Sequence, residues 1–161
     1  MQRLMAAGLF KAEIKNERAT DVNKADAASS FQFSDATGNT RSTSELKGKV
    51  VLINFWATWC PPCRAEMPSL QSLYSKLKND DRIVFLFMNE DEDASKVKFY
   101  LESNGFTMPV TSRIGNLPSE IFNGTLPTTV ILNKQGHIVF RHEGIAAYDH
   151  PAFLAQLEAL M

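Results

Sequence analysis

Two cysteines separated by two residues stand between an apolar run and a helical pattern. They are Cys60 and Cys63, the only cysteines in this 161-residue chain. The run over 49–56 reads as a buried strand, and the run over 64–78 reads as a helix. Thiols at such a junction lie at a helix N-terminus, where the dipole and free backbone N–H groups favour a thiolate. The pattern therefore predicts a redox-active pair.

Other uses of the pair fit the sequence less well. A structural disulfide would close only a four-residue loop and would remove little chain entropy. A zinc site would need two more ligands, and His137, His142 and His150 lack ligand-like spacing. We therefore expect neither a metal nor a cofactor.

Composition favours one globular domain. The chain is 44% hydrophobic with a formal charge of -1, so no global field recruits nucleic acid or an anionic membrane. No apolar run approaches the roughly 18 residues that span a bilayer. We expect residues 1–28 to be a leader or linker, poorly structured or a short helix, and residues 29–161 to be the domain. The first residues match a signal peptide poorly, and the sequence leaves open whether a targeting segment was removed.

The hydrophobic pattern predicts alternating strands and helices. A mixed sheet in an α/β fold follows from this order and from the hairpin turn at 133–136. Pro68 should kink the first helix, and Asp149 should cap the last. The predicted strands are 31–33, 49–56, 82–87, 108–110, 128–132 and 137–141, and the predicted helices are 64–78, 91–103, 117–122 and 151–161.

A set of motifs adds a resemblance that covers residues 29–161. The chain resembles the thioredoxin superfamily, and more closely its TlpA/ResA-like branch of extracytoplasmic thiol–disulfide oxidoreductases. The resemblance implies a thioredoxin-like fold, with a central mixed sheet flanked by helices and an extra helix and strand, over 89–122, before a cis-proline loop. It rests on Asn54 to Cys63, Glu66, Pro68, Leu126 to Thr129 and Gly144.

The cysteines are expected to play different roles. Cys60 precedes the helix and should be the partly exposed nucleophile with a lowered pKa. Cys63 lies one turn in and should be the buried resolving thiol. Pro61 and Pro62 lack N–H groups, so only the N–H of Cys63 can reach the Cys60 sulfur. Trp59, together with Pro61 and Pro62, should form a surface against which substrate docks.

The resemblance implies roles for residues outside the cysteine motif. Pro127 should follow a cis bond and expose the Leu126 backbone to an extended substrate, although it could simply start a strand. Glu66 should accept the proton of the resolving thiol, although it could be a solvated carboxylate in the first helical turn. Thioredoxin has a buried Asp where this chain has Asn54, which cannot titrate.

These features predict a monomeric thiol–disulfide oxidoreductase that reduces protein disulfides through a mixed disulfide. Its partners would be disulfide-bearing proteins and an upstream thiol donor, with apocytochrome c as one option, in a periplasmic or membrane-tethered setting. A peroxiredoxin-like peroxidase is the rival enzyme, but that family sets Thr three residues before its cysteine, where this chain has Ala57. A redox-inert binding or chaperone module is the second rival. The direction of electron flow stays open.

Overall fold

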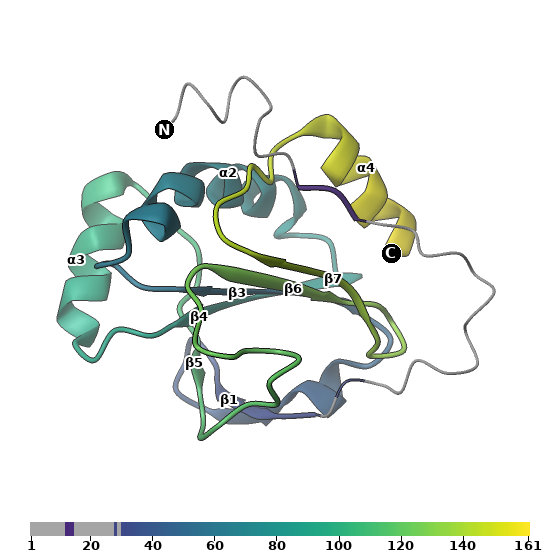
Figure 1. The fold of residues 1–161 in the computed structure, drawn as a ribbon, viewed down its shortest axis with the longest axis horizontal. Coiled ribbons are helices and arrows are strands. Elements are labelled where there is room, and N and C mark those ends of the chain that lie inside the picture. Colours follow the sequence, from purple (N-terminus) through teal and green to yellow (C-terminus); the bar gives the residue numbers. More distant parts are fainter. Residues whose placement is uncertain (1–11, 15–27, 29) are drawn as a thin grey trace.

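A four-stranded mixed sheet forms the centre of the chain (Figure 1). Its two middle strands, β3 (Val50–Trp56) and β6 (Thr128–Leu132), are buried along their whole length. β3 pairs in parallel with β4 (Ile83–Asn89) and antiparallel with β6, which pairs with the hairpin partner β7 (Ile138–Glu143). A strand buried on both faces has a nearly continuous apolar sequence, which is why the pattern predicts β3 well.

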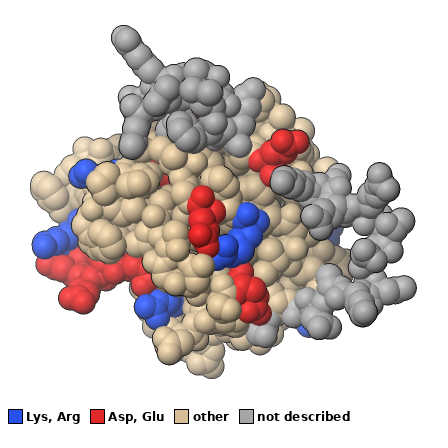
Figure 2. Space-filling view, viewed as in Figure 1, with Lys and Arg blue, Asp and Glu red and all other residues tan. Residues whose placement is uncertain are grey.

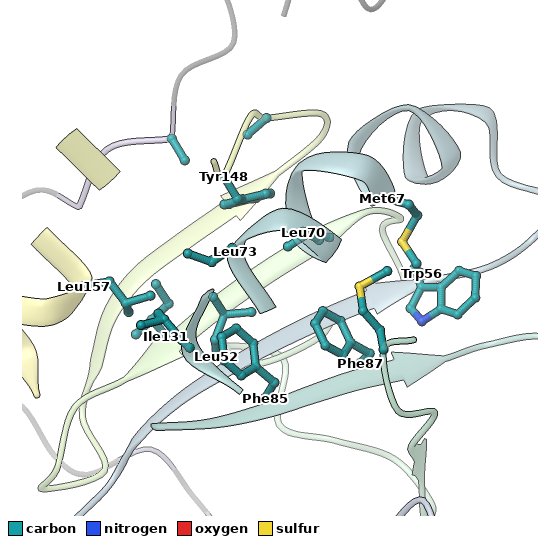
Figure 3. Packing of buried hydrophobic residues seen from close by; sticks show 14 of the residues in the cluster. Leu52, Trp56, Met67, Leu70, Leu73, Phe85, Phe87, Ile131, Tyr148 and Leu157 are labelled. Carbon is teal, nitrogen blue, oxygen red and sulfur yellow. The ribbon is translucent and has the colours of Figure 1, made fainter. Parts of the chain in front are cut away.

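The computed structural model describes residues 12–14, 28 and 30–161. Within them, α2 (Pro61–Leu77), α3 (Ala94–Asn104) and α4 (Pro151–Leu160) bury their apolar sides in one core against the same face of the sheet. Figure 3 shows part of this core, in which Leu70 and Leu73 of α2 lie above the strands beside Tyr148.

The opposite face of the sheet carries a second, smaller sheet. Its strands are β1 (Gln32–Ser34), β2 (Thr40–Ser42) and β5 (Ser112–Arg113), and a 3-10 turn, η1 (Thr43–Leu46), follows β2. Apolar side chains from β3, β4 and β6 on this face pack against Phe31 and Phe33. The result is a thioredoxin-like α/β fold of helices, central sheet and small sheet, as the sequence predicts.

Several predicted boundaries are wrong. α2 begins at Pro61 rather than residue 64, because proline fits the first helical positions, where no N–H bond is needed. For the same reason, Pro151 at the first turn of α4 places its cap at His150 rather than Asp149, and the His150 ring accepts from the Ala152 N–H. Pro68 lies inside α2, which continues to Leu77.

The insertion between β4 and β6 also departs from prediction. The predicted strand at 108–110 is displaced to β5, after a single bridge between Met88 and Thr111. The predicted helix at 117–122 is one turn only, in which the Pro118 carbonyl accepts from the N–H groups of Ile121 and Phe122. Ile121 is buried in the second core, so burial of this side chain stabilises the turn together with these hydrogen bonds.

A short part of the predicted leader is described. Ala12 and Ile14 are buried, and the Ile14 N–H donates to Gln156 Oε1 of α4 at 2.8 Å. Most of residues 1–28 lie outside the described residues, including the predicted short helix. In the part of the chain that the structure describes, none of the helices has the length and apolarity needed to cross a membrane.

Candidate active site

Two loops meet at one edge of the central sheet. β3 ends at Trp56 and leads into the cysteine motif, whereas β6 begins at Thr128, directly after Pro127. Phe55 and Thr128 are register partners in the antiparallel β3–β6 pair. The register therefore brings the cysteine loop and the proline loop to the same edge.

Cys60 and Cys63 form a disulfide, with their Cα atoms 5.3 Å apart. Cys60 is the N-cap of α2, and its Sγ accepts a hydrogen bond from the Cys63 N–H at 3.3 Å. This is the donor that Pro61 and Pro62 leave available. An N–H donor at a helix N-terminus also favours negative charge on sulfur when the disulfide is open.

The exposure of the two sulfurs differs from the prediction in one respect. Cys63 is fully buried, as expected, but Cys60 is only 4% exposed rather than partly open. In this oxidised form, Cys60 Sγ is bonded to Cys63 Sγ and accepts a hydrogen bond from the Cys63 N–H.

The surface around the pair is apolar. Trp59 is 66% exposed, Pro61 is exposed and Pro62 is half-buried. Trp56 is instead a packing residue, as expected, since it is buried with its ring 5.8 Å from that of Tyr100. Trp59 is thus an exposed aromatic side chain beside the cysteine pair.

The peptide bond between Leu126 and Pro127 is cis, as predicted from the resemblance. The Gly144 N–H donates to the Pro127 carbonyl at 2.8 Å, and Gly144 has a φ of 95°, which a glycine adopts readily. Thr128 Oγ1 donates to the Thr125 carbonyl at 2.7 Å. These bonds hold the proline loop, and the Leu126 side chain stays half-buried.

Glu66 is fully buried, one helical turn after Cys63. Its Oε1 accepts from Asn54 Nδ2 at 2.8 Å, and its Oε2 accepts from the Ala146 N–H at 3.3 Å. The alternative of a solvated helix-start carboxylate is therefore wrong. Burial raises the pKa of Glu66 from its ordinary 4.5 to about 8, and the two hydrogen bonds oppose that shift.

The raised pKa predicts that the oxidised protein loses stability with rising pH. The folded state holds the Glu66 proton more tightly than the unfolded chain, so the favourable contribution is full below pH 4.5 and is lost as pH rises to about 8. The free energy of unfolding should fall by up to about 1.4 kcal/mol per pH unit in this window. Urea unfolding measures it. Glu66→Gln should remove this slope, whereas the control Glu102→Gln, at an exposed glutamate of α3, should keep it.

The contact that Asp91 makes with the cysteine loop is not predicted from the sequence, because the acidic run 90–93 has the composition of a solvated helix start. Asp91 is half-buried, and its carboxylate accepts from the Thr58 N–H at 2.8 Å and from the Thr58 hydroxyl. Asn89 Nδ2 donates to the same carboxylate at 2.8 Å. Because β3 and β4 are parallel neighbours, the loops that follow them lie side by side. A predicted parallel pairing of these two strands is the feature from which a contact between Asp91 and Thr58 could have been expected.

Removing the Asp91 carboxylate should loosen the loop before Cys60. We expect Asp91→Ala to lower the free energy of unfolding by about 1.5–3 kcal/mol, since it leaves the Thr58 N–H without its acceptor. Urea unfolding at neutral pH measures the change. Glu92→Ala, at the exposed next residue, is the control and should change stability by less than about 0.5 kcal/mol. Equal stabilities of the two variants would contradict this role.

No cluster of three or more His, Cys, Asp or Glu side chains that could hold a metal ion occurs among residues 12–14, 28 and 30–161. The site itself offers three features that bear on its chemistry. These are a disulfide at a helix N-terminus, a buried carboxyl group one turn further on and a cis-proline loop at the same sheet edge.

Residues 23–157 match the family described as Redoxin. The chain belongs to the Redoxin family. Among curated proteins, it is 34% identical over 118 residues to the thiol-disulfide oxidoreductase ResA of Halalkalibacterium halodurans. That match covers 73% of this chain and 66% of the relative, so the chain spans about two thirds of the relative's length.

Two solved structures have the same fold as this chain. StoA from Bacillus subtilis has a TM-score of 0.63 and 26% identity, covering 83% of this chain and 96% of that one. A putative thiol:disulfide interchange protein DsbE from Chlorobium tepidum has a TM-score of 0.64 and 26% identity, covering 86% and 94%. The resemblance to ResA-like thiol–disulfide oxidoreductases and the thioredoxin-like fold are thereby confirmed.

Proposed function

We propose that this chain is a thiol–disulfide oxidoreductase whose Cys60–Cys63 dithiol reduces disulfides of other proteins and is itself oxidised to the Cys60–Cys63 disulfide. The observation that carries the proposal is the disulfide at the N-terminus of α2, where Cys60 Sγ accepts the Cys63 N–H. The thiol-disulfide oxidoreductase ResA, to which the chain is similar, has the activity that this geometry suits.

In the reducing direction, the dithiol form starts the reaction. The Cys60 thiolate attacks one sulfur of a substrate disulfide, and a mixed disulfide forms as the other substrate sulfur leaves as a thiolate. Cys63 then loses its proton, and its thiolate attacks Cys60 Sγ. The Cys60–Cys63 bond forms, the second substrate sulfur leaves, and the substrate has gained the two electrons that the chain has lost.

Glu66 is the group proposed to accept the Cys63 proton. It lies one turn along α2 from Cys63, and residues three apart lie on the same helix face. With a pKa near 8, its carboxyl group can exchange a proton at physiological pH, which an ordinary glutamate seldom does. A base with a pKa close to the working pH is the one that transfers protons most effectively.

The substrate is proposed to lie between Trp59 and the Leu126–Pro127 loop. Trp59 supplies an exposed aromatic face, and the cis bond turns the chain just before β6. An extended segment could then add to the Leu126 backbone as a short strand. Backbone pairing would give affinity for many protein segments, with little dependence on their side chains.

The partners are proposed to be disulfide-bearing proteins, with an upstream thiol donor that reduces the pair again. Charges of both signs lie side by side on the face in Figure 2, so charge does not select partners of one sign there. Apocytochrome c, a periplasmic or membrane-tethered location and a monomeric state rest on the resemblance to the TlpA/ResA-like branch. They stay predictions.

A turnover assay separates this function from its two rivals. With dithiothreitol as the donor, the protein should reduce the disulfides of insulin far faster than the donor alone. A peroxidase would instead consume hydrogen peroxide, and a redox-inert module would accelerate neither reaction. Peroxide turnover without insulin reduction would contradict the proposal.

A further inference from the structure

The Glu66 carboxylate sits in a set of buried hydrogen bonds that also includes Asn54 of β3. Asn54 Nδ2 makes two bonds, one to Glu66 Oε1 at 2.8 Å and one to Thr129 Oγ1 at 2.9 Å. Asn54 and Glu66 are fully buried, and Thr129 is nearly so. Asn54 and Thr129 are direct register partners across β3 and β6, so the sheet itself fixes their separation.

Two bonds from one nitrogen define how the Asn54 amide is turned. Its N–H groups point to Glu66 and Thr129, while Oδ1 has no hydrogen-bond partner among the described residues. This orientation presents a donor to Glu66, and a donor suits a carboxylate that carries negative charge.

Groups that face Glu66 from the neighbouring elements are polar rather than cationic. No lysine, arginine or histidine forms an ion pair with Glu66 within residues 12–14, 28 and 30–161. Ala146, after β7, donates its backbone N–H, and Tyr148 lies near enough that burial and then the Glu66 charge raise its pKa. Tyr148 is a titratable group close to Glu66, and His142, the register partner of Thr129 in β7, contacts the Ile145 carbonyl next to Ala146.

We propose that Asn54, held in place by Thr129, is a positioning residue that orients Glu66 and stabilises its ionised form in the resolution step. The inference rests on the proposed function, since it concerns the proton that Cys63 gives up. Among the described residues, the Asn54 amide and the Ala146 N–H donate to Glu66 and offset the cost of its buried charge. Loss of Asn54 should therefore make Glu66 harder to ionise and the Cys63 proton harder to remove.

The test is the pH dependence of resolution, measured by stopped-flow after a mixed disulfide is formed at Cys60. Asn54→Leu keeps the side-chain size and removes both donors. We expect resolution near pH 7 to slow roughly tenfold or more, with the midpoint of its pH profile moved to higher pH. Attack by Cys60 should keep its rate.

Thr129 supplies a second, milder variant in case Asn54→Leu does not fold. Thr129→Val removes the hydroxyl that holds the amide and should move the midpoint in the same direction, while Thr129→Ser should restore it. Thr111→Val is the matched control, because its buried hydroxyl donates to the Met88 sulfur and not to this set. It should lower stability and leave the midpoint where it is.

A double-mutant cycle with Glu66→Gln separates positioning from packing. In the Glu66→Gln protein, Asn54→Leu should slow resolution no further, although it should still lower stability. Equal slowing in both backgrounds, or an unmoved midpoint in Asn54→Leu and Thr129→Val, would overturn the inference and leave the proposed function standing. Absence of any mixed disulfide at Cys60 would overturn the proposed function itself.

Discussion

Cys60→Ser is expected to reduce disulfide exchange to the rate of the uncatalysed reaction. The helix N-terminus and the Cys63 N–H act on the Cys60 sulfur, and serine cannot form the mixed disulfide that exchange requires. Cys63→Ser should also lose multiple turnover, but for another reason. It should still attack a substrate disulfide once and then stay trapped as the mixed disulfide.

Insulin reduction under multiple turnover measures both losses, and circular dichroism checks the fold. Both variants lack the disulfide, so each serves as the control for the other's stability. A single-turnover burst in Cys63→Ser that is absent from Cys60→Ser would fit the assigned order of attack. A burst in Cys60→Ser would contradict it.

Glu66→Gln is expected to slow the resolution step by about 10²-fold, the usual scale for a lost general base. Glutamine keeps the shape and can still accept one of the two hydrogen bonds, from Asn54 Nδ2 or from the Ala146 N–H, through its single oxygen. It cannot take a proton. The first step, attack by Cys60, should change little. The pH profile of resolution should lose the ionisation near pH 8 that burial gives Glu66.

Stopped-flow kinetics from about pH 5 to 9 on both steps checks this result. Glu102→Gln, on the exposed side of α3, is the matched control and should behave as the wild-type protein. Identical resolution rates and pH profiles for Glu66→Gln and wild type would mean that the buried carboxyl group has only a structural role.

Much of the fold is predictable from the sequence because its central elements have strong local signals. β3 is apolar except for Asn54, and α2 follows it with one apolar face, so hydrophobic periodicity alone predicts the strand–cysteine–helix unit. The cis Leu126–Pro127 bond is predicted by the family resemblance, since the sequence around a proline says little about its isomer. The insertion is predicted less well, because its β5 is two residues long and its 118–122 turn is stabilised in part by burial of Ile121.

Only half of the site can be predicted from the sequence, for a related reason. Cys60, Cys63 and Glu66 lie on one stretch of chain, so their spacing in the sequence is enough to predict that they lie close together. The partners of Glu66 come from other elements: Asn54 from β3, and the Ala146 N–H from the segment after β7. The sequence identifies Asn54 only as a residue that cannot titrate, because its use as a donor depends on the β3–β6 register. A backbone N–H donor such as that of Ala146 cannot be predicted from residue types, because every residue except proline has one.

Mapping of the trapped adduct tests the central assignment most directly. Cys63→Ser and Cys60→Ser proteins would each be reduced, mixed with a protein disulfide such as insulin, quenched with acid and digested for mass spectrometry. We expect adducts on Cys60 in the Cys63→Ser protein, because the helix N-terminus favours its thiolate. We expect few or none on Cys63 in the Cys60→Ser protein, because Cys63 is fully buried. Adducts on Cys63, with none on Cys60, would contradict the account.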